Sequence, residues 1–327
     1  MEKALGTRQQ AELMAKLTVL VLGGGPDSER EVSLRSAMCI ADALDATDRY
    51  RAERSTIDRL SIDELKSLPG QVIFPALHGG WGEGGPLQDL LEFDGRAFVG
   101  SASGAARWAM DKVATKFAAQ KLGVLTPRVH VMDLRDIVCP LPFPVVIKPI
   151  HEGSTVGLFV CRDLGEWAVA RRTIEDAEHM GEKRHFMIEP CIMGRGGAKA
   201  RELTVGVLDG QPLPVIEIKP AEGLYDYEAK YTREDTQYLI NPPLPTGVDA
   251  LIKKQTADLA AEMDVRHVAR ADFMLDGEGL AWFLEINTLP GFTDHSLVPK
   301  AAKSTGLEMP ELCSRLVEMA LRDGGLR

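Results

Sequence analysis

Four polar side chains stand on two apolar segments near the C-terminal end of the chain. Residues 268–275 (VARADFML) and 280–286 (LAWFLEI) flank the sequence DGEG at 276–279, which is typical of a β-hairpin turn. Successive side chains of a strand point to opposite faces, so one face of this hairpin carries Arg270, Asp272, Glu285 and Asn287. Two carboxylates and an amide oxygen, without Cys or His, suit a hard ion such as Mg²⁺ or Mn²⁺.

A turn centred on residues 277–278 also predicts the register of this hairpin. Arg270 then lies opposite Glu285, and Asp272 lies opposite Phe283. The other face carries apolar side chains, which are Ala271, Phe273, Leu284 and Ile286. A slip of one residue would put the two acidic side chains on different faces. The sequence leaves a second interpretation open, in which the polar face is a solvated outer surface with a cross-strand ion pair.

Strands, glycine turns and helices alternate through the first 100 residues. The expected strands are short apolar runs at 17–22, 71–77 and 96–99. Ser28 followed by Glu31 has the spacing of a capping box and predicts a helix that continues to about Leu44. This alternation is typical of a parallel sheet covered by helices, so we expect an α/β fold here.

Two stretches rich in small residues, 100–104 and 193–198, mark the expected domain boundaries. They divide the chain into an N-terminal α/β domain (1–100), a central part (101–192) and a C-terminal part (193–327). In the second and third parts we expect α+β structure. Strands are expected at 144–149, 156–161, 185–189, 202–208, 213–218, 267–275 and 280–286, and helices at 111–122, 163–180, 249–263 and 309–322.

The composition excludes several classes of protein. The 327 residues include 38 Lys and Arg and 48 Asp and Glu, so the formal net charge of −10 argues against a nucleic-acid or anionic-membrane binder. No apolar run approaches the length of a membrane span, and the N-terminal segment lacks an apolar signal core. The five cysteines show no metal or redox spacing, which favours a reducing cytoplasm.

Eight motifs, in order and spacing, make the chain resemble the D-alanine–D-alanine ligases of the ATP-grasp superfamily. They are GGGPDSEREVSL (23–34), LHGGWGEGGPLQ (77–88), MDK (110–112), IKPIHEGSTVG (147–157), YDYEAKY (225–231), RADFMLD (270–276), LEINTLPGFT (284–293) and HSLVP (295–299). The resemblance implies three domains, with ATP held between the central and C-terminal ones. It further implies ATP-driven condensation of two D-alanines for peptidoglycan synthesis, and a homodimer.

The resemblance assigns a set of nucleotide and metal contacts. It implies that Lys112, Lys148 and Lys230 bind ATP phosphates, that Glu189 and the backbone of Ile192 bind adenine, and that Glu202 binds the ribose hydroxyls. Ser154 belongs to a glycine-flanked loop over the phosphates. Asp272, Glu285 and Asn287 would hold one or two Mg²⁺ or Mn²⁺ ions. For Lys148 the residues alone leave open an edge lysine whose ammonium reaches solvent.

A second set of residues is assigned to the substrates. The resemblance implies that Glu29 and His78 lie at the first D-alanine, and that Ser154 and Tyr231 bond to each other over it. Arg270 and the backbone N–H of Gly291 would stabilise the oxyanion, while Ser296 and Leu297 would bind the second carboxylate. From the residues alone, Glu29 is better explained as a first-turn helix acid than as a substrate ligand, and a core histidine bonded to the backbone is the alternative for His78.

Other functions are consistent with parts of the sequence. A related ligase that joins D-alanine to D-lactate or D-serine would share most of these motifs. A non-catalytic ATP-binding protein would be expected to have lost some of the polar residues named above. The hypothesis of an NAD-dependent oxidoreductase is based only on the first strand and the glycines after it. The spacing of these glycines does not match G-x-G-x-x-G.

Overall fold

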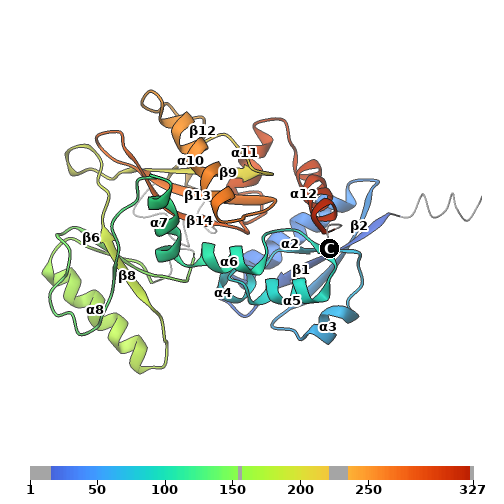
Figure 1. Ribbon diagram of the computed structural model, residues 1–327, viewed down its shortest axis with the longest axis horizontal. Helices are drawn as coiled ribbons and strands as arrows, with labels where there is room; N and C mark the ends of the chain where they lie inside the picture. The colour runs from blue at the N-terminus through green and yellow to red at the C-terminus, as the bar shows by residue number, and fades with distance from the viewer. Residues whose placement is uncertain (1–15, 154–156, 221–234, 325–327) are drawn as a thin grey trace, which may run out of the picture.

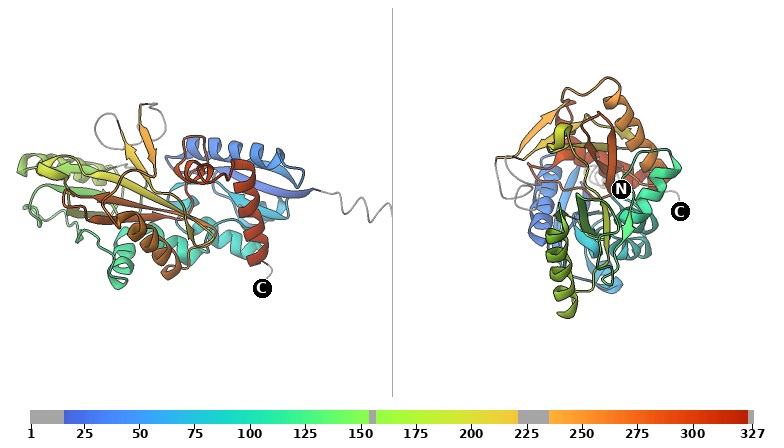
Figure 2. Two further views of the ribbon diagram at one scale, coloured as in Figure 1. Left: turned by 90° about the horizontal axis from the view of Figure 1, so that it is seen from above. Right: turned by 90° about the vertical axis from the view of Figure 1, so that its left-hand side faces the viewer.

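Three β-sheets organise the protein (Figure 1). The computed structural model describes residues 16–153, 157–220 and 235–324. The strand orders are β2-β1-β3-β4 for the first sheet, β5-β8-β6-β7 for the second, and β12-β11-β9-β13-β14 for the third, where β10 also pairs with β9. The first and second sheets lie at opposite ends of an elongated molecule (Figure 2). The expected α/β fold, with α+β structure in its second half, is confirmed.

The first sheet is parallel, as predicted. Its elements are β1 (Leu17–Gly24), α2 (Arg30–Asp45), β2 (Tyr50–Ile57), α3 (Ile62–Ser67), β3 (Val72–Pro75), α4 (Gly79–Gly82), α5 (Pro86–Asp94) and β4 (Ala97–Phe98). Strand β2 escaped prediction because its sequence, YRAERSTI, is mostly polar. It is an edge strand whose middle residues are partly or fully exposed, so it needs few apolar side chains.

The predicted capping box at the start of α2 is wrong. Helix α2 begins at Arg30 after the N-cap residue Glu29, which makes no side-chain cap hydrogen bond. Ser33 instead accepts a hydrogen bond from the backbone N–H of Gly24 at 2.8 Å. The glycine turn after β1 is therefore fastened to the first turn of the helix, and Glu29 stays directed toward the site described below.

The second sheet carries one helix on its face. Its elements are β5 (His130–Val131), β6 (Val145–Pro149), β7 (Phe159–Cys161), α8 (Leu164–His179) and β8 (Phe186–Pro190). Trp167, Ala170 and Ile174 of α8 pack on β6 and β8. Two earlier helices, α6 (Ser103–Met110) and α7 (Lys112–Lys121), contact strand β14 of the third sheet instead.

The third sheet and the C-terminal helices complete the core. The elements are η1 (Arg195–Gly197), β9 (Arg201–Leu208), β10 (Gln211–Pro212), β11 (Ile216–Lys219), β12 (Gln237–Ile240), α10 (Val248–Glu262), β13 (Val268–Leu275), β14 (Ala281–Asn287), α11 (Leu297–Lys303) and α12 (Met309–Gly324). Helix α12 returns to the first sheet, where Leu312 and Leu316 share a core with Val19 and Val21. None of the helices in the described ranges has the length and apolar character that a membrane span requires.

The register of the β13–β14 hairpin differs from the prediction by two residues. Arg270 lies opposite Asn287, and Asp272 lies opposite Glu285. The five-residue loop between Leu275 and Ala281 supplies one residue of this shift, and a bulge next to Phe273 supplies the other. An even shift preserves the face of each side chain, so the predicted polar face is confirmed. The two carboxylates are direct neighbours.

Leu284 is the residue that the bulge displaces. We expected it on the apolar face, yet it is partly exposed and lines the same cleft as Asp272 and Glu285. A bulge leaves two residues of one strand opposite a single partner and re-aims their side chains. Leu284 and Glu285 therefore both face the cleft, and Leu284 gives it an apolar wall.

A buried histidine fastens the boundary near residue 100 to the third sheet and to α12. The backbone N–H of Gly100 donates to Nδ1 of His267 at 2.9 Å, and Nε2 of His267 lies 3.0 Å from Oδ2 of Asp323. The neighbouring backbone N–H of Arg266 donates to Ser101 Oγ at 3.1 Å. Burial, together with the charge of Arg266, lowers the pKa of His267 to about 4.

We expect this histidine to make the protein less stable in acid. The unfolded chain takes up a proton as the pH falls below about 6.5, whereas the folded protein does not until about pH 4. The free energy of unfolding should therefore fall by up to about 3 kcal/mol between these values. Urea unfolding at pH 7.5 and pH 5 should show about 2 kcal/mol of this loss.

The His267→Asn variant isolates the contribution of this histidine. Its side-chain oxygen can still accept from Gly100, and asparagine tolerates the positive φ of 61° at this position. This variant should lose less stability on acidification than the wild type does. The exposed His179→Asn variant is the control, and an equal acid loss in all three proteins would contradict the assignment.

Candidate active site

A cleft between the second and third sheets collects many of the predicted residues. Seven of them line it, and they are Lys112, Lys148, Glu202, Arg270, Asp272, Glu285 and Leu297. They come from β6 on one side, from β9, β13 and β14 on the other, and from the starts of α7 and α11. Residues far apart in the chain thus bring three cations and three carboxylates to a single cleft.

Arg270 and Asp272 form a paired unit in this cleft. Nε and Nη2 of Arg270 donate to the two carboxylate oxygens of Asp272 at 3.0 and 2.8 Å. Thr204 on β9 donates to Oδ1 of the same carboxylate at 2.6 Å. The side chains of Arg270 and Asp272 are only 17% and 16% exposed. The alternative of a solvated outer surface with a cross-strand ion pair is therefore wrong.

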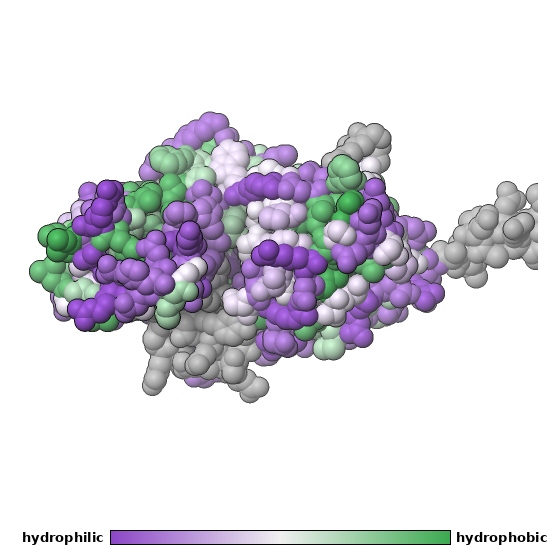
Figure 3. Space-filling view, turned by 90° about the horizontal axis from the view of Figure 1, so that it is seen from below, coloured by the Kyte–Doolittle hydropathy of each residue, from purple (hydrophilic) through white to green (hydrophobic). Residues whose placement is uncertain are grey.

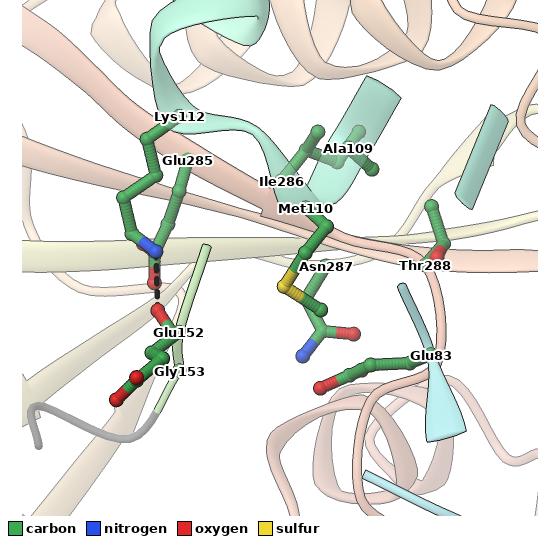
Figure 4. Close-up of a pocket in the computed structure, with 10 residues that line it drawn as sticks. All are labelled: Glu83, Ala109, Met110, Lys112, Glu152, Gly153, Glu285, Ile286, Asn287 and Thr288. Carbon is green, nitrogen blue, oxygen red and sulfur yellow. Dashed lines mark hydrogen bonds and ion pairs between the residues drawn. The ribbon is translucent and has the colours of Figure 1, made fainter. Parts of the chain in front are cut away.

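Lys112 connects the hairpin to the second sheet. Its Nζ lies 3.4 Å from Oε2 of Glu285 and donates to the backbone carbonyl of Glu152 (Figure 4). Asp111 caps helix α7 by accepting from the backbone N–H groups of Val113 and Ala114 at 2.9 and 3.0 Å. This cap fixes the first turn of α7, and with it the lysine.

A buried triad of charges lies behind the cleft. Lys148 and Lys116 approach the two oxygens of Glu189 at 2.7 and 2.8 Å, and all three side chains are nearly inaccessible. Burial lowers the pKa of Lys116 to about 8, although Glu189 acts in the opposite direction. Both oxygens of Glu189 face ammonium groups, so its predicted contact with the adenine amino group remains a prediction.

Glu29 and His78 lie on the N-terminal side of the same region. Glu29 is 7% exposed and lines a hollow that also contains Glu152 and Gly153. The backbone at Gly153 approaches Glu29 so closely that an added Cβ would lie 3.4 Å from Oε2. Burial lowers the pKa of His78 even though the charge of Glu29 acts to raise it.

The loop after β14 holds the predicted oxyanion and carboxylate groups. Ser296 is the N-cap residue of α11, and its Oγ accepts from the backbone N–H of Thr293 at 2.8 Å. A Cβ at Gly291 would lie 3.0 Å from Ser296 Oγ. Gly291 and Ser296 are thus neighbours, and Leu297 follows at the buried start of the helix. Their roles toward the oxyanion and the second carboxylate stay predictions.

Comparisons with known proteins agree with this geometry. The family model described as "D-ala D-ala ligase C-terminus" matches residues 125–318. The D-alanine--D-alanine ligase of Syntrophotalea carbinolica is 39% identical over 313 residues, which are 94% of this chain and 97% of the relative. The chain belongs to the D-alanine–D-alanine ligase family. The relative from Methylacidiphilum infernorum is 37% identical over 305 residues, 92% of this chain and 95% of that protein.

Solved structures of the family share the fold. The D-alanine--D-alanine ligase of Bacillus anthracis superposes with a TM-score of 0.80 at 28% identity, covering 94% of this chain and 99% of that one. A second structure of that enzyme, complexed with ATP, gives a TM-score of 0.78 and covers 95% of this chain and 99% of its own. The ATP-grasp architecture expected from the motifs is therefore confirmed.

The three residues predicted to hold a metal ion present a donor set that suits a hard divalent cation. Asp272 and Glu285 supply carboxylates, and Oδ1 of Asn287 keeps one lone pair after accepting from the N–H of Leu289 at 2.8 Å. Among residues 16–153, 157–220 and 235–324, no group of three or more His, Cys, Asp or Glu is placed to hold a metal. The predicted set therefore consists of two carboxylates and an amide oxygen, and its role as a metal site stays a prediction.

Four predicted residues stand apart from this description. Ser154, Lys230 and Tyr231 lie outside the described residues. Ile192 is half-buried just beyond the end of β8.

Two buried charged residues of this region, Lys116 and Glu83, were not identified from the sequence. Two features of the sequence could have indicated them. Lys116 follows Lys112 by one helical turn, and Glu83 lies within the LHGGWGEGGPLQ motif.

Proposed function

We propose that this protein joins two D-alanine molecules into D-alanyl-D-alanine while ATP is cleaved to ADP and phosphate. One observation carries the proposal. The cleft places Lys112 and Lys148 across from the paired carboxylates of Asp272 and Glu285, with Arg270 beside them. Cations suit the phosphates of a nucleotide, and acidic oxygens suit the divalent ion that accompanies them. The names of the relatives supply the identity of the amino acid.

The reaction requires an activated carboxylate, because a free carboxylate is a poor acyl donor. An oxygen of the first D-alanine's carboxylate attacks the γ-phosphorus of ATP, and the bond from that phosphorus to ADP breaks. The product is an acyl phosphate with a good leaving group. Lys112 and Lys148 hold the phosphates and offset their charge, which is the main catalytic contribution in phosphoryl transfer.

Three residues of the hairpin would hold a divalent ion beside the phosphates. Mg²⁺ or Mn²⁺ would be held by Asp272, Glu285 and Asn287, and when bound it neutralises charge on the phosphates. Lys112 and Arg270 stand beside Glu285 and Asp272 respectively. They keep these carboxylates paired with positive charge in the structure described here.

The second step forms the peptide bond. The deprotonated amine of the second D-alanine attacks the acyl carbon, and the bond to the phosphate oxygen breaks with release of inorganic phosphate. Arg270 donates to the oxyanion of the tetrahedral intermediate, together with the backbone N–H of Gly291. The same proposal places the first ammonium at Glu29 and the second carboxylate at Ser296 and Leu297.

The biological setting is proposed with the reaction. The dipeptide serves peptidoglycan precursor synthesis, and the enzyme works as a cytoplasmic homodimer. All five cysteines lie in the described residues and none forms a disulfide, which is consistent with a reducing compartment. The dimer rests on the family resemblance alone.

Phosphate release tests the function. Purified protein with ATP and Mg²⁺ should release phosphate with D-alanine but not with L-alanine, and chelation of the metal should stop the release. Parallel reactions with D-alanine plus D-lactate or D-serine separate the related ligases by the mass of the product. Absence of phosphate release with every amino acid would favour a non-catalytic ATP-binding protein.

A further inference from the structure

A serine of helix α2 reaches the loop that joins β14 to α11. The Oγ atom of Ser36 accepts a hydrogen bond from the backbone N–H of Phe292 at 3.2 Å, although the two residues stand 256 positions apart in the chain. They are only 1% and 2% exposed. A buried backbone N–H without a partner is costly, and a loop offers no regular backbone partner. Ser36 therefore supplies a bond that the loop itself does not provide.

Two further contacts fasten the same loop to the N-terminal part of the chain. The ring of Phe292 lies edge-on against Phe74 of β3, with the centroids 5.7 Å apart and the planes at 80°. Cys39, which follows Ser36 by almost one helical turn, hydrogen-bonds the backbone of Asp294. The loop is thus held by one ring contact and two hydrogen bonds, and both of these bonds come from α2.

Gly291 is the residue whose backbone these contacts restrict. An added Cβ at Gly291 would lie 3.0 Å from Ser296 Oγ and 3.9 Å from Ser36 Oγ, so the backbone passes close to both hydroxyl groups. This close approach requires a glycine, but a glycine backbone can adopt many conformations. The bond from Phe292 to Ser36 fixes the peptide group that follows Gly291. It therefore removes part of the freedom that the glycine introduces.

Helix α2 also connects this loop to the N-terminal side of the site. Glu29 is the N-cap residue of α2, and Ser36 follows it by seven positions. Seven residues are close to two turns of an α-helix, so the two side chains share one face and lie about 10 Å apart along the axis. Ile40 and Leu44 fix the helix in the core that it shares with the first sheet. A single rigid element thus carries Glu29 and anchors the loop of Gly291.

Resting on the proposed function, we propose that Ser36 is a positioning residue for peptide-bond formation. It holds the segment at Gly291 and Phe292 so that the N–H of Gly291 meets the oxyanion, and it keeps Ser296 at the carboxylate of the second D-alanine. A donor that is already in place requires no reorganisation when the charge develops. In the proposed mechanism this loop takes part only in the second step, so Ser36 acts on that step alone.

Hydroxylamine separates the two steps, because it reacts with an acyl phosphate without help from the enzyme. Its nitrogen bonds to the acyl carbon, the bond to the phosphate oxygen breaks, the nitrogen loses a proton, and D-alanine hydroxamate and phosphate form. The enzyme is supplied with ATP, Mg²⁺, D-alanine and hydroxylamine, and the hydroxamate and the dipeptide are measured together. Their ratio reports how long the acyl phosphate waits for the second D-alanine.

The Ser36→Ala variant should still form the acyl phosphate and use it more slowly. Alanine favours the helix and removes only the acceptor. We expect the ratio of hydroxamate to dipeptide to rise about tenfold, because one buried hydrogen bond is lost. The KM for ATP should stay unchanged. An equal fall of both products in Ser36→Ala, or the absence of hydroxamate, would overturn the inference, because a bond that only stabilises the fold affects both steps together.

Ser314→Ala is the matched control. Ser314 is also buried on a helix, α12, where its hydroxyl donates to the backbone carbonyl of Pro310 at 2.7 Å. This variant should keep the wild-type ratio, and a rise equal to that of Ser36→Ala would again overturn the inference. A wild type that forms neither hydroxamate nor dipeptide would refute the proposed function, and the inference with it. A wild type that forms dipeptide beside an unchanged ratio in Ser36→Ala would refute the inference alone.

Discussion

Replacing Arg270 with alanine is expected to abolish dipeptide formation while ATP affinity stays within about a few-fold. The guanidinium lies beside the reacting carbonyl in the proposed mechanism, and a single oxyanion donor contributes about 10²- to 10³-fold to turnover. The bidentate pair with Asp272 adds to this effect, because Asp272 would lose the two bonds that orient it. Phosphate release at saturating D-alanine gives both the turnover and the KM for ATP. A loss of turnover reports the catalytic role of Arg270, and a change in KM reports an effect on nucleotide binding.

Arg201→Ala is the matched control for this variant. Arg201 also forms a bidentate pair, with Glu217 at 2.9 and 2.8 Å, on the same sheet. It alternates with Glu202, which lines the cleft, so its side chain lies on the opposite face of β9. This control should lose stability but keep its turnover. A large loss of ATP affinity in Arg270→Ala, with normal turnover at saturation, would contradict the assigned role.

The polar face of the hairpin was predictable, whereas its register was not. Alternation along each strand decides the face, and any even shift leaves it unchanged. The register depends on the length of the turn and on the bulge at Leu284, which the sequence does not mark. The prediction therefore put the acidic residues on the correct face of the hairpin and opposite the wrong partners.

The burial of two charged side chains in the site could not be predicted from the sequence. Lys116 reads as an ordinary helix lysine, and its burial becomes understandable only when Glu189 is brought beside it. Glu83 reads as a loop acid between glycines, and its burial follows from the return of its carboxyl group onto Gly79. The contact of Lys116 joins residues far apart in the chain, whereas that of Glu83 spans four residues and depends on the backbone turn of α4.

The surface around the second sheet exposes several apolar side chains. Several exposed apolar side chains lie on α8, just after it, and in the connection between β5 and β6; they are Ile137, Val138, Leu164, Val169 and Met180. Figure 3 shows apolar residues at this end of the molecule, interspersed with hydrophilic ones, and a second apolar group in the opposite half of the same face. The second sheet is small and has one covering helix, so a larger part of its apolar surface remains uncovered.

The Glu189→Ala variant is expected to lose about 3–5 kcal/mol of folding stability, because it leaves two buried ammonium groups without their shared partner. Lys116 would retain Thr126 Oγ1 at 3.0 Å and the carbonyl of Pro127 at 3.3 Å, which bind an ammonium but do not balance its charge. Lys148 would also lose the carboxylate that directs it, so the KM for ATP should rise. Urea unfolding and ATP-dependent turnover measure the two effects.

Two comparisons show whether the triad acts as a unit. Lys116→Met removes one cation and leaves the Lys148–Glu189 pair intact, so it should destabilise the protein less than Glu189→Ala does. Glu262→Ala removes a surface partner of Lys121 and should change stability by no more than about 0.5 kcal/mol. If Glu189→Ala lost as little folding stability as the surface control, the two lysines would not depend on Glu189 to balance their charge. The triad would then not hold Lys148 at the nucleotide.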